Sequence, residues 1–269
     1  MDLNTNQHSA STASRIQEIK MKGYHLDFTE TFNEAFEIYK KIALIAGLGV
    51  LLVVVGAIIF GFGGLALFIG GDLTIDNFQM FNDPDSSLQF EIIYLGFLSL
   101  LTALITPITA GFLQLAYDAD KNQDVSFGTI FSFYSHPAFK NLFISGLILS
   151  ALSAVISIGF KFLDLEMLGI LLSIIITFLT FLTVPLIIFG KLSALDAIQA
   201  SITVVSKNPL MIIGLLIVAY LFALMGLIAL CIGYLFTTPF LYAMYYSIYK
   251  KSVGIDTDAV ELVKSEDYF

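Results

Sequence analysis

The sequence has little charge and few of the side chains that usually hold metal ions. Only 13% of its 269 residues are charged and 57% are apolar, whereas about a quarter of the residues of ordinary soluble proteins are charged. The one cysteine, Cys231, excludes an intrachain disulfide framework and any metal site built from several cysteines. The three histidines, His8, His25 and His136, lie far apart in the sequence and leave little for histidine-based metal catalysis. We therefore expect no metal ion and no other cofactor.

Basic side chains are also scarce. The 13 Lys and Arg residues stand against 22 Asp and Glu residues, and the formal net charge is -9. A general nucleic-acid-binding protein is therefore excluded, because nothing here could neutralise a run of phosphates. Residues 1–41 are polar and mixed in charge, with no apolar run behind the first basic residues, so we expect no cleavable signal peptide. The high mean hydropathy of +0.87 points to the membrane as the surroundings of this chain.

Long uncharged runs predict six membrane-spanning helices, because about 20 apolar residues in a helix match the roughly 30 Å of bilayer hydrocarbon. The predicted spans are about 42–71, 92–117, 141–160, 167–190, 210–230 and 232–249. The last two come from one uncharged run, Leu210 to Tyr249. As a single helix this run would be about 60 Å long, close to twice the hydrocarbon thickness, so we expect a reversal bracketed by Gly226 and Gly233.

The predicted fold is all-α, a polytopic membrane bundle of six transmembrane helices arranged as three hairpins with cytoplasmic interfacial helices. A polar N-terminal tail over residues 1–27 precedes the membrane domain of residues 28–251. An acidic tail follows over residues 252–269. Both tails are expected in the cytoplasm.

The distribution of basic residues predicts this orientation. In the six-span arrangement, twelve of the 13 Lys and Arg residues fall on one face, and Lys161 is the exception. Since Lys and Arg are retained on the cytoplasmic side, both termini of this multi-pass protein should face the cytoplasm. The opposite face carries an acidic segment, residues 72–91, which has five acidic side chains and no basic one.

Three stretches of the predicted cytoplasmic face, residues 28–48, 127–147 and 195–215, are similar to one another. Each has an amphipathic segment, a basic residue and then the start of a span. The aligned residues are Lys40, Lys140 and Lys207, followed by Gly47, Gly146 and Gly214. An internal repeat of three hairpins entered through interfacial helices explains the pattern. The alternative, equally open, is that these segments are the first turns of long membrane helices that project into the cytoplasm.

Local signals mark where the interfacial helices begin. Thr31 and Glu34 have the spacing of a capping box, and Ser193 with Asp196 offers a similar start. Aromatic residues at helical spacing after Phe28 predict an apolar face at the headgroup boundary.

The even-numbered spans share a threonine–proline pattern. Its members are Thr106 with Pro107, Thr183 with Pro185, and Thr237 and Thr238 with Pro239. Proline inside a span frees a backbone carbonyl, which a nearby threonine hydroxyl can satisfy. One interpretation is a hinge or a polar translocation path that also includes Thr109. The other, which we favour, is a kink that allows packing, because proline is common in membrane helices. Gly146, Ser150 and Ala154 likewise suit close helix contact.

The last quarter of the chain contains a pattern of small, basic, hydroxyl, proline and aromatic residues, formed by Ala197, Ile198, Ser201, Lys207, Asn208, Gly233, Thr237, Pro239, Ala243 and Tyr246. In this pattern the chain resembles a group of bacterial six-helix membrane proteins, which includes the YciC-like proteins and the membrane domains of some glycerophosphoryl diester phosphodiesterases. The resemblance implies a location in the bacterial inner membrane. The resemblance implies an architecture more than an activity, because the group has no agreed biochemical function.

The functional expectation rests on the six uncharged runs, the one-sided lysines and the aromatic interfacial segments, while the composition of the predicted spans speaks against ion-coupled transport. The spans contain no Asp, Glu, Lys, Arg or His, although ion-coupled transporters usually keep such a residue within the bilayer. No catalytic motif is visible either. We therefore expect a non-enzymatic envelope or lipid-associated component whose partners include membrane lipids. The alternative is a transporter or exporter of an apolar or amphiphilic solute, and a membrane-embedded enzyme is the least supported class.

Overall fold

The computed structural model describes residues 3–68, 88–228 and 232–255. Within these ranges the chain forms helices and connecting turns and no strand, which confirms the all-α prediction. The helices are α1 (Leu3–Lys22), α2 (Phe28–Phe68), α4 (Leu88–Asp120), the 3₁₀ helix η1 (Phe127–Tyr134), α5 (Phe139–Phe162), α6 (Glu166–Thr180), α7 (Thr183–Ile188), α8 (Ala194–Lys207), α9 (Pro209–Ile228), α10 (Ile232–Thr237) and α11 (Pro239–Ser252).

Several helices are long and apolar enough to cross a membrane, as a multi-pass membrane protein requires. Among the described residues there are five candidates, namely Phe28–Gly61, Glu91–Asp120, Phe139–Phe162, Glu166–Ile188 and Pro209–Ile228. Large apolar side chains are exposed along them, for example Val155 at 68% and Ile174 at 59%. In water such surfaces would be costly, whereas in lipid they are solvated by acyl chains.

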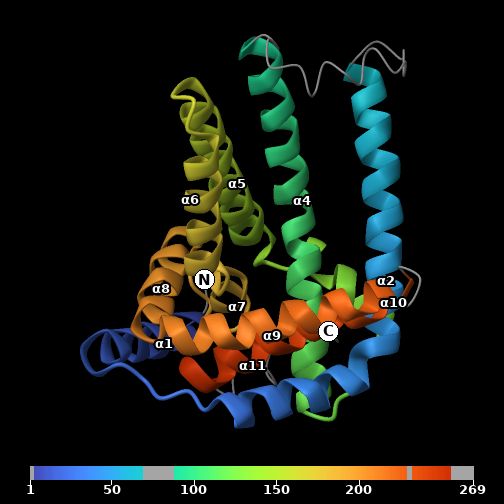
Figure 1. Ribbon diagram of the computed structural model, residues 1–269. Helices are drawn as coiled ribbons and strands as arrows, with labels where there is room; N and C mark the ends of the chain where they lie inside the picture. Colours follow the sequence, from blue (N-terminus) through green and yellow to red (C-terminus); the bar gives the residue numbers. More distant parts are fainter. Residues whose placement is uncertain (1–2, 69–87, 229–231, 256–269) are drawn as a thin grey trace.

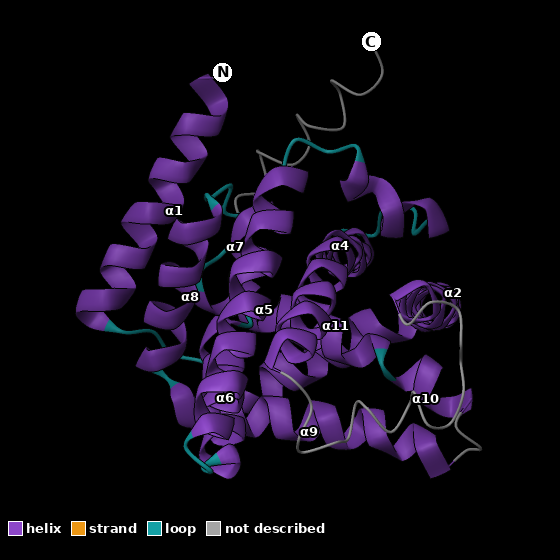
Figure 2. Cartoon of the chain, turned by 90° about the horizontal axis from the view of Figure 1, so that it is seen from above, coloured by secondary structure: helices purple, strands orange, loops and turns teal. Residues whose placement is uncertain are grey.

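The candidate helices do not all run in the same direction. In Figure 1, α4, α5, α6 and the later part of α2 rise from a base that contains α1, the first part of α2, α9 and α11. Figure 2 shows α2 and α4 nearly end-on, while α9 lies lengthwise, so α9 is crosswise to them in both views. The six spans and three hairpins are therefore not confirmed, whereas the all-helical fold and its five candidate membrane helices among the described residues are consistent with a helical membrane bundle.

The predicted sixth span, residues 232–249, contains a break. It forms α10 and α11, which are separated at Thr238 because Pro239 lacks a backbone N–H and occupies the first position of α11. The expected reversal is present, since α9 ends at Ile228 and α10 begins at Ile232. Gly226 allows the two helices to meet, because a Cβ there would lie 2.5 Å from the carbonyl carbon of Gly233.

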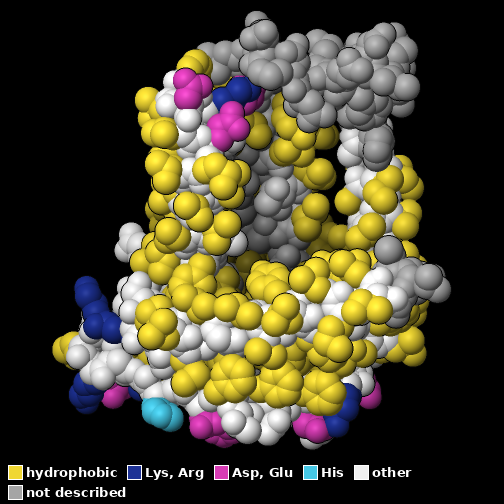
Figure 3. All heavy atoms as spheres, viewed as in Figure 1, with side chains coloured by type: hydrophobic (Ala, Val, Ile, Leu, Met, Phe, Trp, Pro, Cys, Tyr) yellow, Lys and Arg dark blue, Asp and Glu magenta, His cyan; other side chains and the backbone are white. Residues whose placement is uncertain are grey.

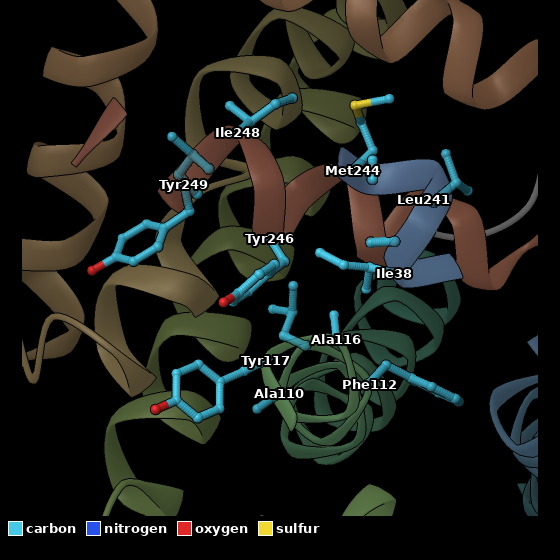
Figure 4. Close-up of a cluster of buried hydrophobic side chains, with 14 of the residues drawn as sticks. Ile38, Ala110, Phe112, Ala116, Tyr117, Leu241, Met244, Tyr246, Ile248 and Tyr249 are labelled. Atoms are coloured by element: carbon cyan, nitrogen blue, oxygen red, sulfur yellow. The ribbon is translucent and has the colours of Figure 1, made fainter. Parts of the chain in front are cut away.

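The buried core lies at the base of the molecule. Figure 4 shows Tyr117 of α4 beside Tyr246 and Tyr249 of α11, and all three side chains are almost completely buried. The aromatic face of α2 contributes to this core, since Phe32 meets Phe240 with ring centroids 5.6 Å apart. Rings of α9 and α11 contact this face, which is half-buried, and its place at the headgroup boundary stays a prediction.

Charged groups hold the base together. Lys250 on α11 contacts Glu34 on α2 at 2.5 Å and Asp120 on α4 at 2.8 Å, and Lys251 pairs with Glu30 and Glu34. At the opposite end, Lys161 pairs with Glu91 at 3.2 Å. Figure 3 shows the same division, with charged side chains at the two ends and hydrophobic ones between them. Residues 72–87 of the predicted acidic segment, which spans residues 72–91, lie outside the described residues.

The three similar stretches begin in different ways. Asp27 caps α2, because it accepts the backbone N–H of Glu30 at 2.7 Å, so the predicted capping box of Thr31 and Glu34 is wrong by one turn. The start of α8 at Ser193 is as predicted. The first stretch continues directly into a long helix, the second starts as η1, and the third is split between α8 and α9. The internal repeat stays a prediction from the sequence.

Candidate functional site

Two adjoining cavities lie among the apolar helices. The larger, which we call the amphipathic chamber, measures about 1100 Å³ and is bordered mainly by α5, α6 and α9. The smaller, the hydroxyl cavity, measures about 610 Å³ and lies between α4, α5, α6 and α7. The two share Ser157, Ser173, Thr177 and Phe181, so they form one connected region. Figure 3 shows the face above α9, beside α6, as hollowed.

The hydroxyl cavity is polar but uncharged. Of its 19 lining residues, 12 are Ser or Thr, with four from α4, four from α5, three from α6 and one from α7. No lining residue is ionisable. Such a concentration of hydroxyl groups among membrane helices is unlike the apolar surface around it.

Many of these hydroxyl groups already use their proton. Thr106 donates to the carbonyl of Thr102 at 3.0 Å, and Thr180 donates to that of Ile176 at 2.7 Å. The same bond to the preceding helical turn is made by the hydroxyl groups of Thr102, Ser145, Ser150 and Ser153. A hydroxyl group has one donor and two lone pairs, so these six side chains can offer a ligand only acceptors.

The break between α6 and α7 brings Thr183 to the cavity. Leu182 donates its backbone N–H to Ser201 of α8 at 3.2 Å, and the Ser201 hydroxyl donates to the carbonyl of Leu179 at 2.8 Å. Ser201 therefore satisfies the backbone groups that the break frees. Thr183 is 1% exposed, and its Oγ1 has no hydrogen-bond partner among the described residues.

The threonine–proline pairs of the sequence are only partly brought together. Thr106, Thr109 and Thr183 line the hydroxyl cavity. Pro107 and Pro185 are buried in the helices that carry these threonines, and neither lines the cavity.

The third pair lies at the break between α10 and α11, away from both cavities. Thr237 donates across to the carbonyl of Ala223 on α9 at 2.8 Å, and Thr238 donates to that of Tyr234 at 2.6 Å. Pro239 begins α11. This arrangement ties α10 to α9 and suits packing, while the roles of the other two pairs as hinge or path stay predictions.

The amphipathic chamber combines apolar walls with charged groups at one end. Ile170 and Ile174 of α6 face the same space as Ile213 and Ile217 of α9. At its outer end, away from the base, lie the Lys161–Glu91 ion pair and Glu166.

At the chamber's inner end, Tyr220 and Tyr245 share a hydrogen bond of 2.9 Å between their hydroxyl groups. Lys161 was visible in the sequence as the one basic residue off the cytoplasmic face, whereas the tyrosine pair had no sequence signal. Such a pair forms only when α9 and α11 pack together.

The described residues contain no group of three or more His, Cys, Asp and Glu that could hold a metal ion. The polar groups that line the two cavities are instead neutral hydroxyl groups, the Lys161–Glu91 ion pair and the carboxylate of Glu166. Such groups are able to bind and orient a molecule by hydrogen bonds and charge.

Comparison with known proteins finds no matching family model, no matching curated protein and no matching solved structure.

Proposed function

We propose that this protein is a non-enzymatic, lipid-associated component of the bacterial inner membrane that holds one membrane amphiphile in the amphipathic chamber. The observation that carries the proposal is the lining, which joins an isoleucine-rich wall to polar groups: the hydroxyl groups of Ser157, Ser173 and Thr177 on one side and a charged cluster at the outer end. A lipid has the same division between acyl chains and headgroup. The volume of about 1100 Å³ lies just above the usual range of ligand pockets, about 300–1,000 Å³.

The positions of the charges support a location with both termini in the cytoplasm. Arg15 of α1 donates to the carbonyl of Ser252 at 3.4 Å, so α1 and the end of α11 lie together at the base. The basic residues of α8 and α11 belong to the same end. Because Lys and Arg are retained on the cytoplasmic side, the base is the cytoplasmic face in this proposal. The resemblance of the last quarter to YciC-like proteins agrees with such an architecture and says nothing of activity.

Cysteine labelling tests the orientation. In a Cys231→Ser background, single cysteines replace Asp76 and Lys121, and intact cells are treated with an impermeant thiol reagent. We expect labelling at position 76 and none at position 121 until the cells are opened. The reverse pattern would overturn the orientation.

Lipid retention tests the chamber. The protein is purified in mild detergent, and its bound lipids are measured by native mass spectrometry. Ile174→Trp fills the chamber, because Ile174 lines it and is 59% exposed. Leu171→Trp is the matched control, since Leu171 is on the same helix, is 53% exposed and lines neither cavity. We expect Ile174→Trp to lose bound lipid and Leu171→Trp to keep it. Equal retention by both variants and the parent protein would contradict the proposal.

A second candidate function is transport or export of an amphiphile, and the junction of the two cavities favours it. A headgroup could leave the charged end and follow the hydroxyl groups of α6 towards the base. Flux assays in proteoliposomes compare Thr183→Val, which alters the cavity, with Thr237→Val, which alters only the contact of α10 with α9. Transport through the cavity predicts a lower flux in the first variant only, and unchanged flux in both favours simple binding.

A further inference from the structure

We infer that the hydroxyl cavity is a subsite for an uncharged polyol headgroup, a glycosyl or glyceryl group, of the amphiphile whose chains lie in the amphipathic chamber. This inference rests on the proposed function and names the class of ligand. The two spaces are contiguous through Ser157, Ser173 and Thr177, so one molecule can extend from one into the other.

The lack of ionisable lining residues decides against a charged headgroup. A phosphate or an ammonium group that entered this cavity would lose its hydration and find no oppositely charged side chain to pair with. Burying an unpaired charge is far more costly than burying a hydrogen-bonded hydroxyl group. The charged groups of the region, Glu91, Lys161 and Glu166, line only the chamber and lie at its outer end.

The excess of acceptors decides in favour of a ligand that donates hydrogen bonds. Six of the 12 lining hydroxyl groups, including those of Thr106 and Thr180, donate their hydrogen bond to a helix carbonyl. They can therefore offer a ligand only the lone pairs of their oxygen atoms. A sugar or glycerol group carries several hydroxyl donors without charge. Its own oxygen atoms can accept from lining hydroxyl groups that have no partner in the helix.

Thr183 supplies an independent observation. Its side chain is buried and lines the cavity, yet Oγ1 has no hydrogen-bond partner among the described residues. A buried polar atom without a partner is unfavourable, and most buried polar side-chain atoms have one. A bound polyol beside Thr183 would provide the missing partner after a small shift of the side chain.

The test compares three lipids with identical acyl chains on the full-length protein: a glucosyl diacylglycerol, phosphatidylethanolamine and phosphatidylglycerol. The protein is purified in an amine-oxide detergent, so that no glycoside detergent competes, and lipid retention is measured by native mass spectrometry. We expect the glucosyl lipid to be retained over both phospholipids. In the combined variant Thr177→Val and Thr183→Val, retention of the glucosyl lipid should fall roughly two- to tenfold, the value of one hydrogen bond, while phospholipid retention stays the same.

Two further variants make the result specific. Thr177→Ser with Thr183→Ser keeps both hydroxyl groups and should keep the preference. Thr203→Val, at a half-buried position of α8, removes a hydroxyl group outside both cavities and should change nothing. Size-exclusion chromatography of every variant checks that it is folded.

The outcomes separate this inference from the proposed function. If the parent protein retains all three lipids equally and Ile174→Trp releases them, the chamber binds lipid but the hydroxyl cavity holds water only, and the inference is overturned. Equal loss of all lipids in the valine variant overturns it as well. If the parent protein retains no lipid, or Ile174→Trp changes nothing, the proposed function fails and the inference fails with it.

Discussion

Replacement of Lys250 by methionine should destabilise the protein more than the loss of any exposed lysine. Its ammonium group contacts Glu34 at 2.5 Å and both carboxylate oxygens of Asp120 at 2.8 Å. The three side chains are 30%, 18% and 15% exposed. Without the lysine, Asp120 still accepts the hydrogen bond from the Tyr246 hydroxyl group, and Glu34 still pairs with Lys251. The carboxylate of Asp120 then has no cationic partner in the cluster.

The size of the effect follows from this partial burial. Removing one partner of a fully buried pair costs about 3–5 kcal/mol, because it leaves an uncompensated charge. Since water still reaches part of this cluster, we expect a loss of about 2–3 kcal/mol in the free energy of unfolding. Lys40→Met is the control, because Lys40 and Glu37 form a 2.7 Å pair that is 50% and 66% exposed, and such pairs contribute about 0–1 kcal/mol.

Unfolding in mixed micelles measures both losses. The protein in mild detergent is titrated with dodecyl sulfate, and helix content is followed by circular dichroism. In the double variant Asp120→Asn with Lys250→Met, part of the stability should return, because the extra charge is removed. Equal losses for Lys250→Met and Lys40→Met, or a further loss in the double variant, would refute the reasoning that an unpaired carboxylate causes the effect.

Three further predictions use the same unfolding assay. Burial alone lowers the pKa of Lys250, but its two carboxylate partners outweigh it and raise the pKa above the ordinary 10.5. The stability from this cluster should therefore be complete below pH 10.5 and fall at higher pH. Lys250→Met should reduce that fall without abolishing it, because Glu30 and Glu34 also raise the pKa of Lys251. Asp27→Ala should cost about 1 kcal/mol, because the cap of α2 is lost. Gly111→Ala should lower the free energy of unfolding by about 1–3 kcal/mol, because the new Cβ would lie 2.1 Å from the carbonyl oxygen of Ile130. The control is Gly96→Ala, whose new Cβ has no other atom within 4 Å and should not destabilise the protein.

The positions of the long apolar helices were predictable, because the sequence directly gives the length of each uncharged apolar run. Five of the six predicted spans coincide with candidate membrane helices. The direction of α9 was not predictable, since hydropathy contains no information on which neighbour a helix packs against. The start of α2 was missed for a local reason. Asp27 and Thr31 are both good caps one turn apart, and a sequence pattern alone does not choose between them.

The site was predictable only where proline drew attention to it. Thr106 and Thr183 were singled out beside prolines, and the structure places both at the hydroxyl cavity. Ser157, Ser173 and Thr177 connect the two cavities, but a hydroxyl residue in an apolar helix usually indicates helix packing. Their role depends on which faces of α5 and α6 meet, and this is a property of tertiary structure.

The lipid site depends on the direction of α9, whereas the orientation of the two termini does not. If α2, α4, α5 and the segment from α6 to α7 cross the membrane while α9 lies along its base, the number of crossings is four. If α9 and the segment from α10 to α11 also crossed, it would be six. Both numbers are even, so the lysine distribution and the contact of Arg15 with Ser252 agree with either arrangement. The chamber agrees only with the four-crossing arrangement. Its floor is formed by Ile213, Ile217 and Tyr220, which requires α9 to lie across the base, and an α9 that crossed the membrane would leave the chamber without this floor. The lipid-retention result for Ile174→Trp therefore bears on the direction of α9, which the charge count leaves undecided.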